Sequence, residues 1–499
     1  MAGGRRARQR TRETRGEIES FLSIEPVQVA ELDLRPDGAR LGPGPGGEPV
    51  TSGDVFVLVR RSGRPVGTLV GRVPEGADPA AVLTELARGV AGAGGTAAVR
   101  TEDATAEETA AVRAEGGAER GVAAAWVDGA APRGSAASGA GAAPRGSAAS
   151  GAGAAPRGSA ASGAGVPSAS VVVATRERAG RLARALDSLL AQDHPDVEII
   201  VVDNAPLTQE TRDLVERKYG ERVRYVCEPV PGLAVAHNRG LEAVRGEVVA
   251  FTDDDVVADP RWLTELTAPF AADPGVGCVT GLILPARLRT PAQVLLESHG
   301  GFAKGFTPRT YDPADPPADE PLFPFTAGRF GSGANMAFRT AVLRSVGGFD
   351  PATGAGTRAR GGDDLYGFVR VLAQGHRLHY APAALVWHHH RETWRDLETQ
   401  AYGYGAGLTA YLTAVLVNRP ALLPAFLARL PRGLAHARAL TAARNAAEGA
   451  DTGVPGGHDA RTHPWPRRLS RLQRRGMLYG PVGYLRARRA LRTSNPGER

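Results

Sequence analysis

Residues 248–255 read VVAFTDDD, an apolar run that ends in three consecutive aspartates, Asp253, Asp254 and Asp255. A short apolar run closed by polar residues predicts a buried strand, and open α/β sheets bind their ligands at the carboxyl ends of such strands. Two carboxylates one residue apart can hold a hard divalent cation together with a diphosphate. Taken alone, the stretch fits a metal and nucleotide site and an exposed acidic turn equally well, so its surroundings decide between them.

The surroundings repeat one pattern. Apolar runs at residues 170–175, 197–204 and 223–227 precede the stretch 248–255, and segments with helical spacing of leucines or polar residues separate them. Strands that are apolar throughout and alternate with helices indicate β-α-β units in a parallel sheet that is covered on both faces. Three of the four strands end in polar residues, which would meet along one edge of the sheet. We therefore expect an α/β fold with a mostly parallel sheet.

Short motifs follow these strands in a fixed order. In the first half they are Thr175 after the first strand, Asp203 after the second, GLAVAHNRG at residues 232–240, and the pair Asp253 and Asp255. In the second half they are GSGAN at 331–335, VGGFD at 346–350, GGDDL at 361–365 and VWHHHR at 386–391. In this order, over residues 169–407, they resemble a family 2 glycosyltransferase with the GT-A fold, a nucleotide-diphospho-sugar transferase fold.

The resemblance implies roles for the polar residues at the expected edge of the sheet. Asp255 would bind a metal ion, Asp253 would lie between the metal and the ribose, and Asp203 would accept a hydrogen bond from the edge of the base. Such ligands suit Mn²⁺ or Mg²⁺. The other residues expected to bind the nucleotide sugar are Thr175, Arg176, Asn238 and Gly333.

The histidine run at 388–390 carries two interpretations. By resemblance one histidine completes the metal shell, with His388 preferred over His390, whereas a solvated strand end is the alternative. His237 stands beside Asn238 where many relatives have arginine, so the charge offered to the diphosphate there would depend on pH.

A base is needed to take the proton of the acceptor hydroxyl. The resemblance places Asp364 in that role, after a Gly-Gly turn that opens a helix, and a simple helix cap is the alternative. The preceding Asp363 stands where the family more often has glutamate, which keeps the charge.

The activity implied is that of an inverting, non-processive glycosyltransferase. It would move one sugar from a nucleotide donor, with UDP- or dTDP-sugars favoured, to a hydroxyl of a glycan, a lipid or a natural product, as in cell envelope or polysaccharide biosynthesis. The Gln-x-x-Arg-Trp motif of processive synthases is absent, and no nucleophile for a retaining path is evident. Two alternatives stay open. One is a nucleotidyltransferase of similar fold, although residues 175–180 match its Gly-rich loop poorly. The other is a catalytically degenerate sugar-binding scaffold.

Composition divides the chain into five segments. Three copies of a repeat that begins APRGSAASGAG fill most of residues 129–166, and such small residues predict a flexible linker because they cannot bury enough surface to fold. The linker separates the transferase domain at 167–407 from a small α+β module at 17–128, which shows three strand-like segments and a helix. Residues 1–16 form a basic N-terminus, and 408–499 form a helical, Arg-rich tail.

Charge limits the partners that we expect. From Arg461 onward the tail has eleven arginines and one acidic residue. It would either make peripheral contact with an anionic membrane or form a solvated helical face, and nucleic acid is disfavoured. In both cases we expect the tail to be dispensable for turnover of a soluble acceptor.

Other features bear on the compartment. Two cysteines support neither a disulfide framework nor a zinc site and suit a reducing cytoplasm. The basic N-terminus is not followed by the apolar segment of a signal peptide, and the apolar stretch 408–428 is broken by residues 418–420 and Pro424. We expect a cytoplasmic enzyme, with a peripheral position at the inner face of the membrane if the tail contacts lipid.

Overall fold

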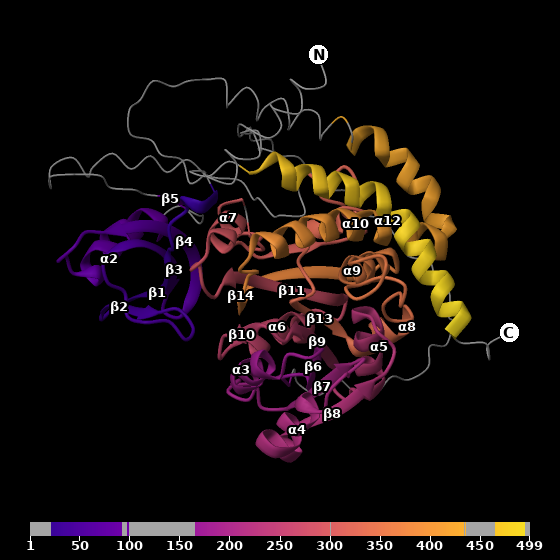
Figure 1. The fold of residues 1–499 in the computed structure, drawn as a ribbon, viewed down its shortest axis with the longest axis horizontal. Coiled ribbons are helices and arrows are strands. Elements are labelled where there is room, and N and C mark those ends of the chain that lie inside the picture. Colours follow the sequence, from indigo (N-terminus) through magenta and orange to yellow (C-terminus); the bar gives the residue numbers. More distant parts are fainter. Residues whose placement is uncertain are drawn as a thin grey trace, which may run out of the picture.

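The computed structural model describes residues 21–91, 97–98, 165–299, 301–433, 435 and 465–494. The basic N-terminus expected at residues 1–16 lies outside these residues, and so does all but the end of the repeat linker expected at 129–166. The described residues form two sheets with the helices that cover them (Figure 1).

The larger sheet contains the expected strand edge. In its order β10-β14-β11-β13-β9-β6-β7-β8, strand β6 pairs in parallel with β7 and β9, and β7 pairs in parallel with β8, as predicted for the nucleotide-binding half. The other half is mixed, because β13 runs antiparallel to both β9 and β11, whereas β11 and β14 are parallel. The strands are β6 (Ala169–Thr175), β7 (Val197–Asn204), β8 (Val223–Glu228), β9 (Val248–Asp253), β10 (Val256–Ala258), β11 (Val276–Pro285), β12 (Arg309–Tyr311), β13 (Asn335–Arg339) and β14 (Arg377–His388).

Helices cover both faces of this sheet, as strands without a polar face require. Successive residues of β6 point to opposite faces, so Val172 belongs to the core under α5 and α9 while Val171 and Val173 belong to the core under α3 and α6. The helices are α3 (Ala179–Leu189), α4 (Glu210–Leu214), α5 (Leu233–Ala243), α6 (Trp262–Ala272), α7 (Pro291–Ser298), α8 (Thr340–Ser345), α9 (Asp363–Ala373), α10 (Trp394–Asn418) and α12 (Arg467–Ser494). Short helical turns are η2 (Val215–Tyr219), η3 (Gly220–Arg222), η4 (Ala327–Arg329) and η5 (Pro420–Leu422).

The smaller sheet is formed by the N-terminal residues, in the order β2-β1-β3-β4-β5, with α2 packed on one face. The three predicted strands and the helix are present, and β2 is an additional strand that follows a Pro-Asp-Gly turn. The elements are β1 (Gln28–Arg35), β2 (Gly38–Pro43), β3 (Gly53–Arg61), β4 (Arg64–Val73), α2 (Pro79–Ala91) and β5 (Ala97–Ala98).

The N-terminal module is docked on the larger sheet, which the sequence did not predict. Strand β3 is buried on both faces, and its Phe56 and Leu58 share a core with Leu385 and Trp387 of β14. The buried guanidinium of Arg60 pairs with Asp259 at 2.6 Å, directly after β10. The module therefore supports the strand that ends at His388, and Figure 1 shows the two side by side.

The helix α10 runs through the domain boundary expected at residue 407 and packs along α12. Glycines allow this close approach: a Cβ at Gly480 would lie 2.0 Å from Oγ1 of Thr409, and one at Gly405 would lie 1.9 Å from the carbonyl oxygen of Gln473. The domain boundary that we propose therefore lies beyond α10, and α12 belongs to the same unit.

The C-terminal helix is part of the core and not an appended tail. Tyr484 of α12 is fully buried, and its hydroxyl donates a hydrogen bond to Asp350 of the VGGFD motif at 2.8 Å. Asn418 of α10 donates to the same carboxylate oxygen at 2.6 Å. Removing the tail would open this core, which argues against our expectation that the tail is dispensable for turnover.

No single helix among the described residues is both long and apolar enough to cross a bilayer. The segments Trp394–Asn418 and Pro420–Gly433 meet this criterion only together, and they are bent by 109°.

We predict that Gly480→Val destabilises the protein, because the added methyl groups collide with the backbone and side chains of α10. Overpacking of this kind costs about 1–3 kcal/mol. The free energy of unfolding measures the effect, and Ala490→Val at an exposed position of the same helix is the control. Equal stability of the two variants would contradict the close packing of α10 and α12.

Candidate active site

The three aspartates at the end of β9 have different neighbours. Asp254 and Asp255 are buried and Asp253 is half-buried. The carboxylate of Asp254 accepts a hydrogen bond from the Thr175 hydroxyl at 2.6 Å and pairs with Arg178 at 3.1 Å. Asp254 therefore joins the ends of β9 and β6, and the hydroxyl of Thr175, which we expected in the nucleotide pocket, is engaged in that link.

Asp253, Asp255 and His388 form a cluster suited to a divalent cation. Each offers one ligand atom, and these atoms all lie within 4.8 Å of one another. They meet because β10 pairs with β14 and sets Val256 opposite His388. Two carboxylates with one imidazole are ligands that Mn²⁺ accepts, and carboxylates also suit Mg²⁺, so the donor set fits the predicted metal ion.

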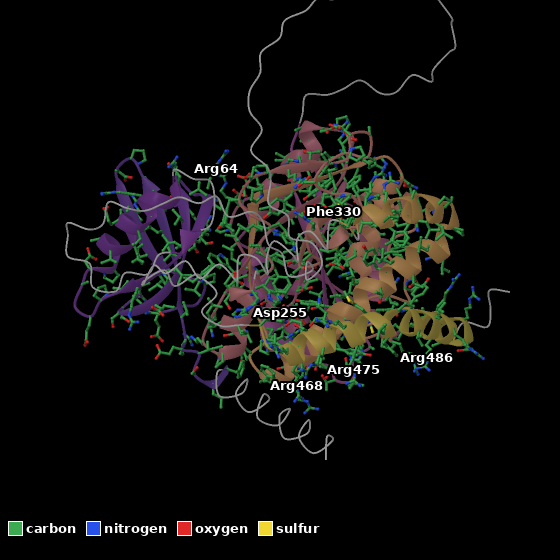
Figure 2. All side chains as sticks on the ribbon, turned by 90° about the horizontal axis from the view of Figure 1, so that it is seen from above. Arg64, Asp255, Phe330, Arg468, Arg475 and Arg486 are labelled. Atoms are coloured by element: carbon green, nitrogen blue, oxygen red, sulfur yellow. The ribbon has the colours of Figure 1, made fainter. Side chains whose placement is uncertain are left out.

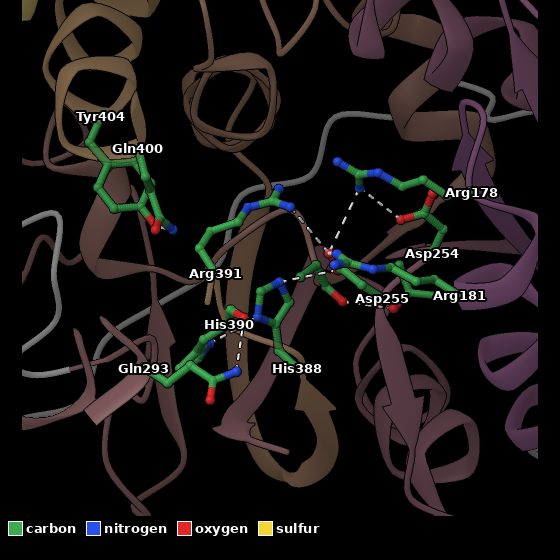
Figure 3. Close-up of polar contacts among 12 residues, drawn as sticks. Arg178, Arg181, Asp254, Asp255, Gln293, His388, His390, Arg391, Gln400 and Tyr404 are labelled. Carbon is green, nitrogen blue, oxygen red and sulfur yellow. Dashed lines mark hydrogen bonds and ion pairs between the residues drawn. The ribbon is translucent and has the colours of Figure 1, made fainter. Parts of the chain in front are cut away.

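His388 is the histidine that faces the aspartates. Its Nε2 atom lies 3.3 Å from Oδ1 of Asp255, whereas His390 lies behind it with 3.0 Å between the two Nδ1 atoms (Figure 3). The role of His388 as the metal ligand stays a prediction, for which its position beside Asp255 is the supporting observation.

Charge crowding shifts the pKa values of the cluster. Burial and the neighbouring Asp255 carboxylate raise the pKa of Asp253 to about 6. Burial opposes ionisation of Asp255 as well, but the charges of His388 and Arg391 outweigh it and lower the pKa of Asp255. Burial alone would keep His388 neutral, yet its contact with Asp255 raises the pKa of His388. The raised pKa of Asp253 reflects repulsion between two neighbouring carboxylates, which a bound cation would relieve.

Three arginines surround Asp255 in addition to the histidine. Their guanidinium nitrogens lie 3.5 Å (Arg181), 3.8 Å (Arg178) and 3.9 Å (Arg391) from Oδ2 of Asp255. Figure 3 shows them converging on Asp255 from two sides. Each side chain keeps between 35% and 40% of its surface exposed. Guanidinium groups that are part exposed can contact an anion that binds at this edge.

Asp364 lies at the start of α9 in a half-buried position. One carboxylate oxygen accepts the Gly333 N–H at 2.9 Å and the other accepts the Leu365 N–H at 2.8 Å. Burial and the charge of Asp363 raise the pKa of Asp364 to about 7. Each oxygen keeps a lone pair, so Asp364 both satisfies a helix N–H, as in the capping alternative, and can accept a proton.

His237 does not lie where the sequence suggested. It is buried between the rings of Phe251 and Phe349, and its Nδ1 lies 3.2 Å from Oδ2 of Asp363. His237 therefore faces the carboxylate beside Asp364 and offers no charge to a diphosphate at the surface, which corrects our expectation.

Asp203 remains suited to the contact with a base that we expect. It is fully buried at the end of β7, and the Tyr225 hydroxyl donates to its Oδ2 atom at 2.9 Å. Its Oδ1 atom has no hydrogen-bond partner within the described part of the chain. Burial raises the pKa of Asp203. An oxygen that lacks a donor can accept one from a ligand, and this contact stays a prediction.

Asn238 is engaged in the fold. Its side-chain amide donates a hydrogen bond to the carbonyl of Phe349 at 2.8 Å and accepts one from the N–H of Phe349 at 2.9 Å. This ties α5 to the VGGFD loop. A contact between Asn238 and the donor stays a prediction, as does one for Arg176, which is exposed.

The sequence reasoning missed several charged residues of the site. Arg178 and Arg181 were not singled out, although they stand three residues apart at the start of a helix that follows the first strand. That position, next to a predicted anion site, is the signal that could have identified them. Glu297 on α7, which contacts His390, gave no such signal because it lies in a different part of the chain.

Comparison with known proteins shows what the central domain is similar to. Residues 167–402 match the family model described as glycosyltransferase like family 2. A pre-mycofactocin glycosyltransferase of Mycobacterium tuberculosis is 29% identical over 238 residues, 47% of this chain and 46% of that protein. A glucosyl-dolichyl phosphate glucuronosyltransferase of Haloferax volcanii is 26% identical over 44% of this chain and 68% of that protein.

Two further similarities are shorter or weaker. An uncharacterized glycosyltransferase of Nostoc is 34% identical over 22% of this chain and 34% of its own length. The chain therefore spans less than half of the Nostoc and Mycobacterium relatives. Among solved structures, a mannosyltransferase of Pyrobaculum calidifontis in complex with GDP-Man and Mn²⁺ is 20% identical over 66% of this chain and 88% of that chain. Its TM-score of 0.36 is too low to carry an inference.

We predict that Asp255→Ala abolishes Mn²⁺ binding and metal-dependent donor turnover while the protein stays folded. The fold should survive because the three arginines around Asp255 are part exposed and can be hydrated. Calorimetric titration with Mn²⁺ and a melting curve measure the two effects. In contrast, Asp254→Asn should lower the melting temperature and retain Mn²⁺ binding, so the reverse pattern would reject Asp255 as the ligand.

Proposed function

We propose that this chain, whose residues 167–402 form a family 2 glycosyltransferase domain, transfers one sugar from a nucleotide-sugar donor to a hydroxyl acceptor with inversion at the anomeric carbon. The observation that carries the proposal is the meeting of Asp253, Asp255 and His388 at the edge of the sheet. The charge of Asp253 contributes to the raised pKa of Asp364, so the two carboxylates belong to one electrostatic environment. We propose that a donor held by Asp253, Asp255 and His388 lies within reach of Asp364.

The donor side of the site would stabilise the leaving diphosphate. Asp253, Asp255 and His388 would hold Mn²⁺ or Mg²⁺, which supplies positive charge to the diphosphate as its bond to the sugar breaks. Arg178, Arg181 and Arg391 would orient the diphosphate, because they are the guanidinium groups already gathered at Asp255. These fixed positive charges act where negative charge develops.

The acceptor side of the site would be served by Asp364. The oxygen of the acceptor hydroxyl forms a bond to the anomeric carbon while the bond from that carbon to the diphosphate oxygen breaks. The electron pair leaves with the diphosphate, and the proton of the hydroxyl passes to Asp364. The N–H groups of Gly333 and Leu365 hold the carboxylate in place for this transfer.

The donor that we propose is a UDP- or dTDP-sugar. The Oδ1 atom of Asp203 can accept a hydrogen bond from the ring N–H that uracil and thymine share. The acceptor that we propose is a glycan, a lipid or a small molecule such as a natural product, as in cell envelope or polysaccharide biosynthesis, and the site would work in the cytoplasm. Turnover of UDP-, dTDP- and GDP-sugars with and without Mn²⁺ tests this choice directly. A nucleotidyltransferase would use the same aspartates and metal, and a degenerate scaffold would bind the donor without turnover, so the products of this assay separate the three.

We predict that Asp364→Asn lowers the transfer rate by about 10² or more with little change in donor binding, because the amide cannot accept the proton. In the wild type, Asp364 must be ionised to act, so the rate should rise with pH up to about 7 and level off above it. Initial rates across pH, together with donor affinity by calorimetry, measure both effects.

The neighbouring Asp363 provides the control. Removing its charge in Asp363→Asn should lower the pKa of Asp364, so the pH profile should shift toward acid. If Asp363→Asn abolishes transfer and Asp364→Asn does not, the base has been assigned to the wrong carboxylate.

We also propose that the outer face of α12 rests on an anionic membrane. The helix has nine arginines and no acidic residue. Leu478, Val482 and Leu485, on successive turns of its outer face, are 82%, 44% and 53% exposed. Arg475 and Arg486 flank them and point away from the body of the protein, as Figure 2 shows. An apolar stripe bordered by cations fits a surface of anionic lipid.

We predict that replacing Leu478, Val482 and Leu485 with serine lowers binding to phosphatidylglycerol vesicles about tenfold or more, since each aliphatic side chain contributes up to about 1.5–3 kcal/mol when buried. Stability should not change, because all three are exposed. Residual binding should fall with added salt. Leu207→Ser, at a residue 79% exposed on the larger sheet's other end, is the matched control, and equal binding of the triple variant and this control would reject the membrane contact.

A further inference from the structure

We infer that Glu297 and His390 are positioning residues that fix the tautomer of His388, so that its Nε2 atom is the one that faces the metal. The inference rests on the proposed function, because it concerns a ligand of the proposed metal site. It goes beyond that function by giving a role to two side chains outside the cluster, the buried His390 and the half-buried Glu297.

A chain of short contacts connects Glu297 to Asp255. Oε2 of Glu297 lies 3.1 Å from Nε2 of His390, and Nδ1 of His390 lies 3.0 Å from Nδ1 of His388. On its other side, Nε2 of His388 lies 3.3 Å from Oδ1 of Asp255. Both ring nitrogens of His388 and both of His390 therefore take part in these contacts.

The donors and acceptors of this chain can be assigned from one end. An ionised glutamate only accepts hydrogen bonds, so His390 donates its Nε2–H to Glu297. A neutral imidazole carries one ring proton, so Nδ1 of His390 is an acceptor and receives the Nδ1–H of His388. In the neutral form of His388 the lone pair is then on Nε2, where a metal ion can bind. A protonated His388 keeps the Nδ1–H donor and also donates its Nε2–H to Asp255, and a bound metal ion would take the place of that second proton.

Without the Glu297 carboxylate the assignment is no longer fixed. His390 could then carry its proton on Nδ1 and donate it to His388. The ring proton of His388 would move to Nε2, where it competes with a metal ion. A carboxylate behind a ligating histidine has this orienting effect in metal sites generally.

Neighbouring side chains hold the row of contacts from Glu297 to Asp255 in place. His390 is buried, and the Phe302 ring lies against both histidines with centroid distances of 5.3 and 5.4 Å. The backbone carbonyl of His390 accepts a hydrogen bond from Gln293 at 3.2 Å. Gln293 and Glu297 both belong to α7, whose Leu295 and Leu296 share a core with the docked N-terminal module.

The test is calorimetric titration of the full chain with Mn²⁺ alone, with melting curves recorded in the absence of metal. Glu297→Met removes the acceptor and should weaken Mn²⁺ binding about 10- to 100-fold. Glu297→Gln keeps an oxygen that can accept from His390, so it should bind within a few-fold of wild type. Glu242→Met, at an exposed glutamate of α5, is the control for the substitution itself.

A second pair of variants keeps the test decisive if Glu297→Met does not fold. His390→Leu should lose Mn²⁺ affinity, whereas His390→Asn, whose side-chain oxygen can take the place of Nδ1, should retain it. Wild-type affinity in a folded Glu297→Met or His390→Leu variant would overturn this inference and leave the proposed function standing. Failure of the wild-type chain to bind Mn²⁺ would overturn both.

Discussion

Like-charge repulsion at the end of β9 is the constraint on which the site depends. Three consecutive carboxylates on a buried strand would repel one another strongly unless positive charge or hydrogen-bond donors met each of them. The chain supplies these partners from separate elements: Arg178 and Arg181 come from the start of α3, and His388 and Arg391 come from the end of β14. Strand pairing allows this, because β9 pairs with β6 and the strand that follows it, β10, pairs with β14.

Much of the architecture and the site could be predicted because the signal is local. The run VVAFTDDD carries its own strand and its own ligands, and Leu182, Leu186 and Leu189 show the buried face of α3 by spacing alone. The choice of His388 over His390 followed from motif position, and the structure places His388 at Asp255. Asp364 was placed at a helix start, where its environment now explains a raised pKa.

Other parts could not be predicted because they depend on pairs far apart in the chain. Arg60 and Asp259 are 199 residues apart, and nothing near either residue indicates that they meet. The sequence of β3 is that of an ordinary core strand, and it does not show that the second face of β3 packs against the larger sheet. His237 is expected at the diphosphate by analogy with an arginine, but its imidazole packs between Phe251 and Phe349, rings that come from separate parts of the chain.

The burial of Tyr484 beside Asp350 has a consequence for how the protein is made. The two residues are 134 positions apart, and strands β6 to β14 all precede Tyr484 in the chain. Domains form from the N-terminal side as the ribosome delivers about 5–20 residues per second. The apolar surface that α12 covers therefore stays exposed on the nascent protein until α12 has been synthesised. During this interval a chaperone that binds exposed apolar surface could bind there.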